Sequence, residues 1–372
     1  MSHLLVTNDF PPKVGGIQSY LWELWRRLDP ASFTVLSTPY DGAEAWDAEQ
    51  PFRVVRAREK VLLPTPSLVR RIDALAAEAG ASLVVLDPAL PLGLLGRRLD
   101  RPYGVVLHGA EVTVPGRLPG SRSVLGRVLR GASEVIAAGG YPAAEGERAA
   151  GRALPVTVVP PGVDPGRFRP LDAEARAKAR ALFDLPADGR VVVSLSRLVP
   201  RKGMDVLIEA AARLGPERQD LVVAIGGSGR DRKRLDRLIE RTGAPVRMLG
   251  RVPDDDLPAL YGCADVYAML CRNRWAGLEQ EGFGIVFLEA AACGVPQVAG
   301  SSGGAAEAVG DGTTGLVVGD PGDPAAVAVA LAALVDDGAR GRTMGAAARH
   351  RAETEFSYDV LAERLAGVLS RW

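Results

Sequence analysis

Short apolar runs, rich in β-branched residues, recur along this chain and are separated by stretches with helical spacing. Strands that are apolar along their whole length belong to parallel sheets covered by helices on both faces. Four runs lie in the first half, at residues 4–7, 82–87, 103–108 and 134–139, and five in the second, at 191–198, 221–227, 246–250, 265–270 and 296–300. The sequence therefore predicts an α/β protein with two doubly wound parallel sheets.

Prolines and glycines cluster in residues 158–170, between the two sets of runs. Such a composition is typical of a domain boundary, and 372 residues are enough for two cores. We predict a first domain over residues 1–160 and a second over 161–354. The final segment, 355–372, has the apolar spacing of a helix that can cross back to the first domain.

Composition excludes several classes of protein. Lys+Arg and Asp+Glu are equal at 45 each, which argues against a dedicated nucleic-acid binder. The three cysteines form no CxxC pair, and with three histidines they assemble no zinc motif. The N-terminus lacks the pattern of a signal peptide, and no apolar run approaches the ~20 residues that span a bilayer. We therefore expect a cytoplasmic protein without a transmembrane segment.

Two stretches suggest phosphate binding. In residues 10–28, a strand is followed by a proline- and glycine-rich loop and then a helix that begins beside Gly15 and Gly16. Because helix N-termini favour anions, a phosphate can sit against Gly16; the alternative is an ordinary tight turn. Further along, Arg197 ends a strand and Lys202 leads into a helix. Two cations at the carboxyl edge of a parallel sheet suit a diphosphate, the alternative being two solvated surface cations.

Two further positions suggest sugar chemistry. His108 ends a strand and precedes a glycine. Most single histidines are structural, and the place at a strand's carboxyl end makes a catalytic role an equal alternative. Glu281 and Glu289 stand eight positions apart around a Gly-Phe-Gly turn that opens a helix. One acid can bind sugar hydroxyls and the other a ribose, while backbone N–H groups between them hold phosphate. Two acids around a helix start also occur by chance.

Taken in order, these stretches resemble a retaining glycosyltransferase of family 4. The resemblance lies in GG near the N-terminus, HG in the first domain, PPGVD..RF.P at the linker, R-x4-KG after a strand, and E-x7-E near the end. It covers most of the chain and implies the GT-B fold, in which two Rossmann-like domains face a cleft. NDFPPKVGGIQSYL and CRNRWAGLEQEGFGIVFLEA are similar to actinobacterial phosphatidyl-myo-inositol mannosyltransferases, in particular those that add the second mannose.

The resemblance implies roles for single residues. The catalytic set would be His108, Arg197, Lys202 and Glu281, with His108 near the reacting carbon and Glu281 on the mannose hydroxyls. The donor nucleotide sugar would be bound by Gly16, Arg197, Lys202, Arg251, Gly284, Ile285 and Glu289. Asp9 and Gln18 are candidates for acceptor binding. No metal or other cofactor is expected, because no DxD motif stands at the expected place; we expect Asp254–Asp256 to cap a helix instead.

The resemblance predicts transfer of mannose from GDP-mannose to a phosphatidylinositol mannoside at the inner membrane face. Alternatives are another nucleotide sugar with a soluble or secondary-metabolite acceptor, and a non-catalytic nucleotide-sugar-binding protein. Two surfaces can contact anionic lipid peripherally: a basic helix with Arg122, Arg127 and Arg130, and a second helix with tryptophans and arginines at 22–27. Ordinary solvated arginines are the alternative. Residues 38–63 look irregular and are candidate acceptor loops.

Overall fold

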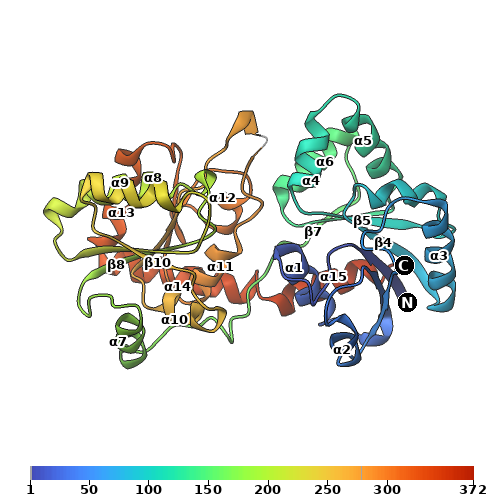
Figure 1. Ribbon diagram of the computed structural model, residues 1–372, viewed down its shortest axis with the longest axis horizontal. Coiled ribbons are helices and arrows are strands. Elements are labelled where there is room, and N and C mark those ends of the chain that lie inside the picture. Colours follow the sequence, from blue (N-terminus) through green and yellow to red (C-terminus); the bar gives the residue numbers. More distant parts are fainter. Residues whose placement is uncertain (1, 278) are drawn as a thin grey trace. The chain divides into compact units, whose positions relative to one another are not determined.

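The computed structural model describes residues 2–277 and 279–372 and contains two compact units. Unit 1 comprises the chain as far as Pro161 together with Tyr358–Trp372, and unit 2 comprises Gly162–Ser357 (Figure 1). Each unit contains one sheet of parallel strands with helices on its faces. The predicted α/β class with two doubly wound domains is therefore confirmed.

Unit 1 has a seven-stranded sheet in the order β3-β2-β1-β4-β5-β6-β7. Its strands are β1 (Ser2–Thr7), β2 (Phe33–Ser37), β3 (Arg53–Arg56), β4 (Ala81–Asp87), β5 (Tyr103–Leu107), β6 (Glu134–Ala137) and β7 (Val156–Val158). Its helices are α1 (Gly16–Trp25), α2 (Ala43–Ala48), α3 (Pro66–Glu78), α4 (Ala110–Arg117), α5 (Ser121–Gly131), α6 (Gly140–Ala150) and α15 (Tyr358–Leu369).

Alternate residues of these strands face two separate helix layers, as period-2 side-chain placement requires. In β1, Leu4 and Val6 pack in the cluster that includes α3, α5 and α6, whereas Leu5 packs in the cluster that includes α1 and α15. Figure 1 shows α1 and α15 together on one side of this sheet. The last helix of the chain thus completes the core of the first unit.

Unit 2 has a six-stranded sheet in the order β10-β9-β8-β11-β12-β13. Its strands are β8 (Arg190–Leu195), β9 (Leu221–Gly226), β10 (Val246–Gly250), β11 (Val266–Met269), β12 (Gln297–Gly300) and β13 (Gly315–Val318). Its helices are α7 (Ala173–Leu182), α8 (Met204–Leu214), α9 (Arg232–Thr242), α10 (Leu257–Gly262), α11 (Ile285–Ala292), α12 (Ala305–Ala308), α13 (Pro324–Val335) and α14 (Gly338–Thr354).

All nine predicted runs form strands, but the sequence reading missed β2, β3, β7 and β13. The interpretation of residues 38–63 as irregular is wrong in part, because α2 and β3 lie there. Asp254–Asp256 forms a 3-10 turn directly before α10, so the triplet does begin a helical segment. No side chain of the triplet caps α10; Asp254 instead accepts a hydrogen bond from Arg167, at 2.6 Å.

Candidate active site

Each sheet has one point at which its strand order reverses direction, between β1 and β4 in unit 1 and between β8 and β11 in unit 2. Ligands of open α/β sheets bind beyond the carboxyl ends of the strands at such points. In unit 1, Thr7 and Asp87 end the two switch-point strands, and His108 follows the neighbouring β5. In unit 2, Arg197 and Lys202 follow β8 and Cys271 follows β11.

The unit 1 edge contains a short chain of hydrogen bonds around a buried carboxylate. Asp87 is fully buried, and its two oxygens have different partners. His108 Nε2 lies 2.6 Å from Asp87 Oδ1, and Thr7 Oγ1 donates to Asp87 Oδ2, also at 2.6 Å. The Thr7 hydroxyl in turn accepts from the backbone N–H of Asp9, at 2.9 Å. The predicted catalytic histidine is therefore linked to a predicted acceptor residue.

Several groups set the charge of His108. Burial opposes its protonation, but the ion pair and hydrogen bond with Asp87, with further contributions from Glu111 and Asp9, raise its pKa above the ordinary value. Tyr20 of α1 packs edge-on against the imidazole, with ring centroids 5.3 Å apart. The Glu111 carboxylate accepts hydrogen bonds from the backbone N–H groups of His108 and Gly109. These contacts thus fix the position of both the ring and the backbone of His108.

Asp9 and Gln18, the two predicted acceptor residues, are adjacent. Gln18 is buried and its Nε2 donates to Asp9 Oδ1 at 2.6 Å, while Lys13 Nζ lies 2.7 Å from the same oxygen. A Cβ on Gly15 would lie 2.2 Å from Gln18 Oε1, so this glycine makes room for the glutamine. Gly16 begins α1, and a Cβ there would meet nothing within 4 Å. The first turn of α1 is accordingly open beside Gly16.

In unit 2, one buried carboxylate holds two cations. Glu281 Oε2 lies 2.5 Å from Arg201 Nη1 and 2.7 Å from Lys202 Nζ, and all three side chains are largely buried. Burial opposes ionisation of Glu281, but Lys202 and Arg201 lower its pKa to about 2. The structure therefore brings the predicted residues Lys202 and Glu281 together as an ion pair. The sequence did not predict a role for Arg201, the second cation.

The second acid of the pair, Glu289, projects from α11 and accepts a hydrogen bond from Tyr261 of α10, at 2.6 Å. Burial raises its pKa above the ordinary value. Gly284 precedes α11 with φ 88°, a left-handed conformation that glycine adopts without strain, and Ile285 is the first helical residue. The α11 N-terminus thus exposes backbone N–H groups between the two acids, as the sequence indicated.

Arg197 and Arg251, the remaining donor candidates, are both exposed. They follow β8 and β10, at the same edge of the unit 2 sheet as Lys202. Neither side chain has a hydrogen-bond or ion-pair partner in the described part of the chain. Both guanidinium groups are free to meet a ligand.

Comparisons with known proteins agree with this arrangement. Residues 14–167 match the family model "Glycosyltransferase Family 4", and residues 176–351 match "Glycosyl transferases group 1". The chain is 42% identical, over 99% of its own length and 98% of the relative's, to a GDP-mannose-dependent alpha-(1-6)-phosphatidylinositol monomannoside mannosyltransferase of Mycolicibacterium smegmatis. The chain belongs to glycosyltransferase family 4. The predicted enzyme class is confirmed.

Two further proteins extend the comparison of this glycosyltransferase. A monoacylated phosphatidylinositol monomannoside mannosyltransferase of Corynebacterium glutamicum, also GDP-mannose-dependent by name, is 37% identical over 98% of this chain and 97% of its own. The crystal structure of Anabaena HepE in complex with UDP has a TM-score of 0.82 and 25% identity, with both chains fully covered. The GT-B architecture of the glycosyltransferase is therefore shared with a protein that binds a nucleoside diphosphate.

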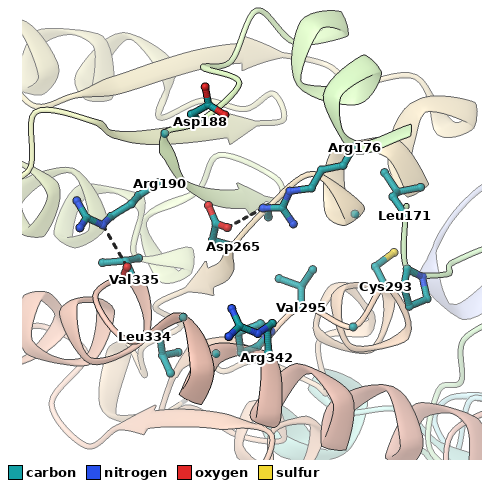
Figure 2. Close-up of a pocket in the computed structure, with 18 residues that line it drawn as sticks. Leu171, Arg176, Asp188, Arg190, Asp265, Cys293, Val295, Leu334, Val335 and Arg342 are labelled. Atoms are coloured by element: carbon teal, nitrogen blue, oxygen red, sulfur yellow. Dashed lines mark hydrogen bonds and ion pairs between the residues drawn. The ribbon is translucent and has the colours of Figure 1, made fainter. Parts of the chain in front are cut away.

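A cavity of about 660 Å³ lies at the other edge of the unit 2 sheet (Figure 2). It is lined by Arg190, which begins β8, and by Arg176 and Asp265, which pair at 2.6 Å. Because Arg190 begins β8 and Asp265 directly precedes β11, the cavity lies at the amino ends of the strands, away from the edge that carries Arg197 and Lys202. Over residues 2–277 and 279–372, no group of three or more His, Cys, Asp or Glu side chains is placed to hold a metal ion.

Proposed function

We propose that this glycosyltransferase moves mannose from GDP-mannose to a phosphatidyl-myo-inositol mannoside, with retention of the anomeric configuration. The observation that carries the proposal is the 42% identity, across nearly the whole of both chains, to an enzyme named for that donor and a phosphatidylinositol monomannoside acceptor. The Corynebacterium glutamicum relative, named for the same donor and a monoacylated acceptor, supports it. The candidate residues in both units supply chemistry that suits it.

The proposed reaction takes place on one face of the mannose. The bond between the anomeric carbon and the diphosphate breaks, and an acceptor hydroxyl bonds to the same carbon from the same side. The hydroxyl proton passes to an oxygen of the leaving diphosphate, so that the products are the mannoside and GDP. Arg197 and Lys202 stabilise the charge that builds on the diphosphate. Glu281 binds mannose hydroxyls, and Glu289, which already accepts from Tyr261, binds the ribose.

There are two alternatives to this function, and one observation bears on each. HepE was solved with UDP, so a uridine nucleotide sugar with a soluble acceptor is the second candidate. A non-catalytic nucleotide-sugar-binding protein would need only the unit 2 residues. The buried Asp87–His108 pair in unit 1 disfavours that reading, because burying two ionisable groups costs stability that a binding role in unit 2 does not require.

A matrix of donors and acceptors tests the proposal. Purified protein is incubated with GDP-mannose, UDP-glucose or UDP-N-acetylglucosamine, each with phosphatidylinositol monomannoside in vesicles or with a soluble inositol phosphate. We expect transfer with GDP-mannose and the lipid acceptor, and an α-linked product by NMR. Transfer with a UDP sugar alone would contradict the donor assignment. If the protein is a transferase, the variant His108→Ala should lose turnover and keep GDP affinity. If it is a nucleotide-sugar sensor, the same variant should retain its output.

For the lipid acceptor, we propose that one surface of unit 1 rests on the membrane. Near the carboxyl edge of the sheet, Val61 and Leu63 are 54% and 56% exposed, and Val124 of α5 is also exposed. Arg127 lines a cavity of about 340 Å³ beside Val124, and that cavity shares its wall with the 3-10 segment Leu92–Arg98. Exposed apolar side chains beside arginines suit an anionic lipid surface.

Several of the other residues considered for lipid contact have partners within unit 1. Arg122 and Arg130 donate to the backbone carbonyls of Arg148 and Ala150 at the end of α6. Trp25, the last residue of α1, is fully buried and donates to His3. Arg27, which follows α1, is paired with Glu23 and Asp359. No helix in the described part of the chain is long and apolar enough to cross a membrane.

Vesicle sedimentation tests this surface. We expect binding to vesicles that contain phosphatidylglycerol, little binding to phosphatidylcholine alone, and weakening by salt because the contact is electrostatic. Arg127→Glu should reduce binding several-fold. Arg213→Glu, on the exposed face of α8 in unit 2, is the matched control and should bind as the unaltered protein does. Equal binding of Arg127→Glu and of the control would show that this surface is not the one that meets lipid.

A further inference from the structure

Asp87 is a carboxylate with full burial and no arginine or lysine on either oxygen within the described residues. Leaving an ionised carboxylate in such a place costs several kcal/mol unless its partners compensate. Its partners are His108 on Oδ1 and Thr7 on Oδ2, both at 2.6 Å. An apolar side chain at the end of β4 would be cheaper to bury. The presence of an acid at position 87 is therefore explained by its effect on His108 rather than by a gain in the stability of the fold.

We infer that Asp87 is a positioning residue, which holds the His108 ring through Nε2 so that Nδ1 is the nitrogen offered to the substrate. A carboxylate only accepts hydrogen bonds, so Nε2 carries a proton in this pair. Nδ1 has no partner among the described residues. The inference deepens the proposed function and rests on it, since it specifies how the candidate catalytic histidine presents itself.

The pair also has a consequence for charge. The acidic groups that face His108 are Asp87 from β4, Glu111 from the first turn of α4, and Asp9 from the loop after β1; the neutral Tyr20 packs from α1. Burial works against protonation of His108, and these three acids outweigh it and raise the pKa of His108. In its charged form the imidazole presents an N–H donor at Nδ1, whereas its neutral form presents an acceptor there.

Thr7 extends the same arrangement toward the acceptor residues. Its hydroxyl donates to Asp87 and accepts from the backbone of Asp9, whose side chain binds Gln18. Asp87 and Thr7 thus connect His108, which follows β5, to the loop after β1 through three hydrogen bonds. The histidine ring and the loop with the candidate acceptor residues are thereby positioned by these two side chains.

Imidazole NMR tests the inference without any assumption about substrates. The chain has three histidines, His3, His108 and His350, and His108→Gln assigns the signal of interest. In the unaltered protein we expect the proton of the neutral ring on Nε2 and a titration midpoint above the ordinary value of about 6.5. A neutral ring protonated on Nδ1, or a midpoint at or below the ordinary value, would overturn the inference. This spectrum decides the matter even if variants of Asp87 fail to fold.

The variant Asp87→Asn supplies the second measurement. Its amide has the shape of the carboxylate but cannot balance a charged imidazole, so the His108 midpoint should fall by at least about one pH unit. His3, whose Nε2 accepts from Trp25, is an internal control, and its titration midpoint should not change.

The kinetics of Asp87→Asn give a further measurement. We expect kcat to fall and its pH profile to follow the new midpoint of His108, with KM for the donor nearly unchanged. A loss of stability with an unchanged midpoint and pH profile would make Asp87 purely structural. Absence of transfer with every donor would refute the proposed function and leave the NMR result standing.

Discussion

Glu281 is buried against two cations, Arg201 and Lys202. The contribution of its ionised carboxylate to the stability of the fold can be measured by varying the pH. Its pKa is about 2 in the folded protein and about 4.3 in an unfolded chain. Because the folded value is depressed, the stabilisation is present above the unfolded pKa and is lost as pH falls from about 5 toward 2. The size of the shift corresponds to roughly 3 kcal/mol. We therefore expect unit 2 to lose that much stability on acidification through this range.

The variant Glu281→Gln should lose about 3–5 kcal/mol at pH 7, because it leaves Arg201 and Lys202 buried without their carboxylate. The difference from the unaltered protein should shrink as the pH approaches 2. Urea unfolding at several pH values measures the loss of stability at pH 7 and its decrease towards pH 2. Glu240→Gln, an exposed position on α9, is the control and should change little. A penalty for Glu281→Gln that is the same at all pH values would contradict the ionic explanation.

Arg197 and Lys202 share a predicted role but should respond differently to truncation. Arg197 is exposed and unpaired in the described chain, so Arg197→Ala should weaken GDP binding about tenfold to hundredfold and leave the melting temperature almost unchanged. Lys202 is buried against Glu281, so Lys202→Ala should reduce both GDP affinity and stability. Calorimetric titration and thermal unfolding separate the two effects. Unchanged GDP affinity in Arg197→Ala would remove that residue from the donor site.

The sequence identified side chains at strand ends but not their partners. His108 and Asp87 each end an apolar run, but nothing in the sequence marks Asp87 as the partner of His108. Their pairing arises because β4 and β5 are neighbours, which becomes known only with the strand order. Arg201 precedes Lys202, and only the backbone turn Pro200–Lys202 brings both cations to Glu281.

At the scale of elements, three of the four missed strands, β3, β7 and β13, lie at the edge of a sheet. β3 has arginines at both ends, β7 has three residues, and both lie at edges of the sheet. Edge strands bury less of each face, so their sequences carry a weaker apolar signal. The fourth missed strand, β2, is an interior strand with all five residues buried, so the edge explanation does not apply to it. Pairing with a neighbour, rather than local composition, makes an edge segment a strand.

The start of α1 offers a prediction at the same scale. Gly16 opens the helix with free space where a Cβ would stand, so Gly16→Ala should leave the melting temperature unchanged or slightly raised. If phosphate rests against this turn, the new methyl group should raise the donor KM several-fold. Gly367→Ala in α15, where a Cβ also meets nothing, is the matched control and should leave KM unchanged. Equal kinetics for both variants would remove Gly16 from the donor site.

At the scale of the whole molecule, the chain passes between the units twice, after Pro161 and after Ser357. The second crossing places α15 in the core of unit 1, where Leu361, Leu365 and Leu369 pack with Leu21 and Trp25 of α1. Arg27, which follows α1, also pairs with Asp359, at 2.6 Å. The two ends of the sequence therefore fold together, and unit 1 cannot be complete until the chain has passed through unit 2.

This connection predicts which unit a core mutation will weaken. Leu365→Ala lies at the C-terminal end of the sequence but should destabilise unit 1, by about 2–5 kcal/mol, because it opens a cavity beside α1. Leu331→Ala in α13, equally buried, should destabilise unit 2 by a similar amount. Hydrogen exchange distinguishes them: Leu365→Ala should speed exchange in β1 and β4 and spare β8 and β9, and Leu331→Ala should do the reverse. Faster exchange in β8 on changing Leu365 would mean that α15 stabilises unit 2 as well, and the assignment of the last helix to unit 1 alone would be wrong.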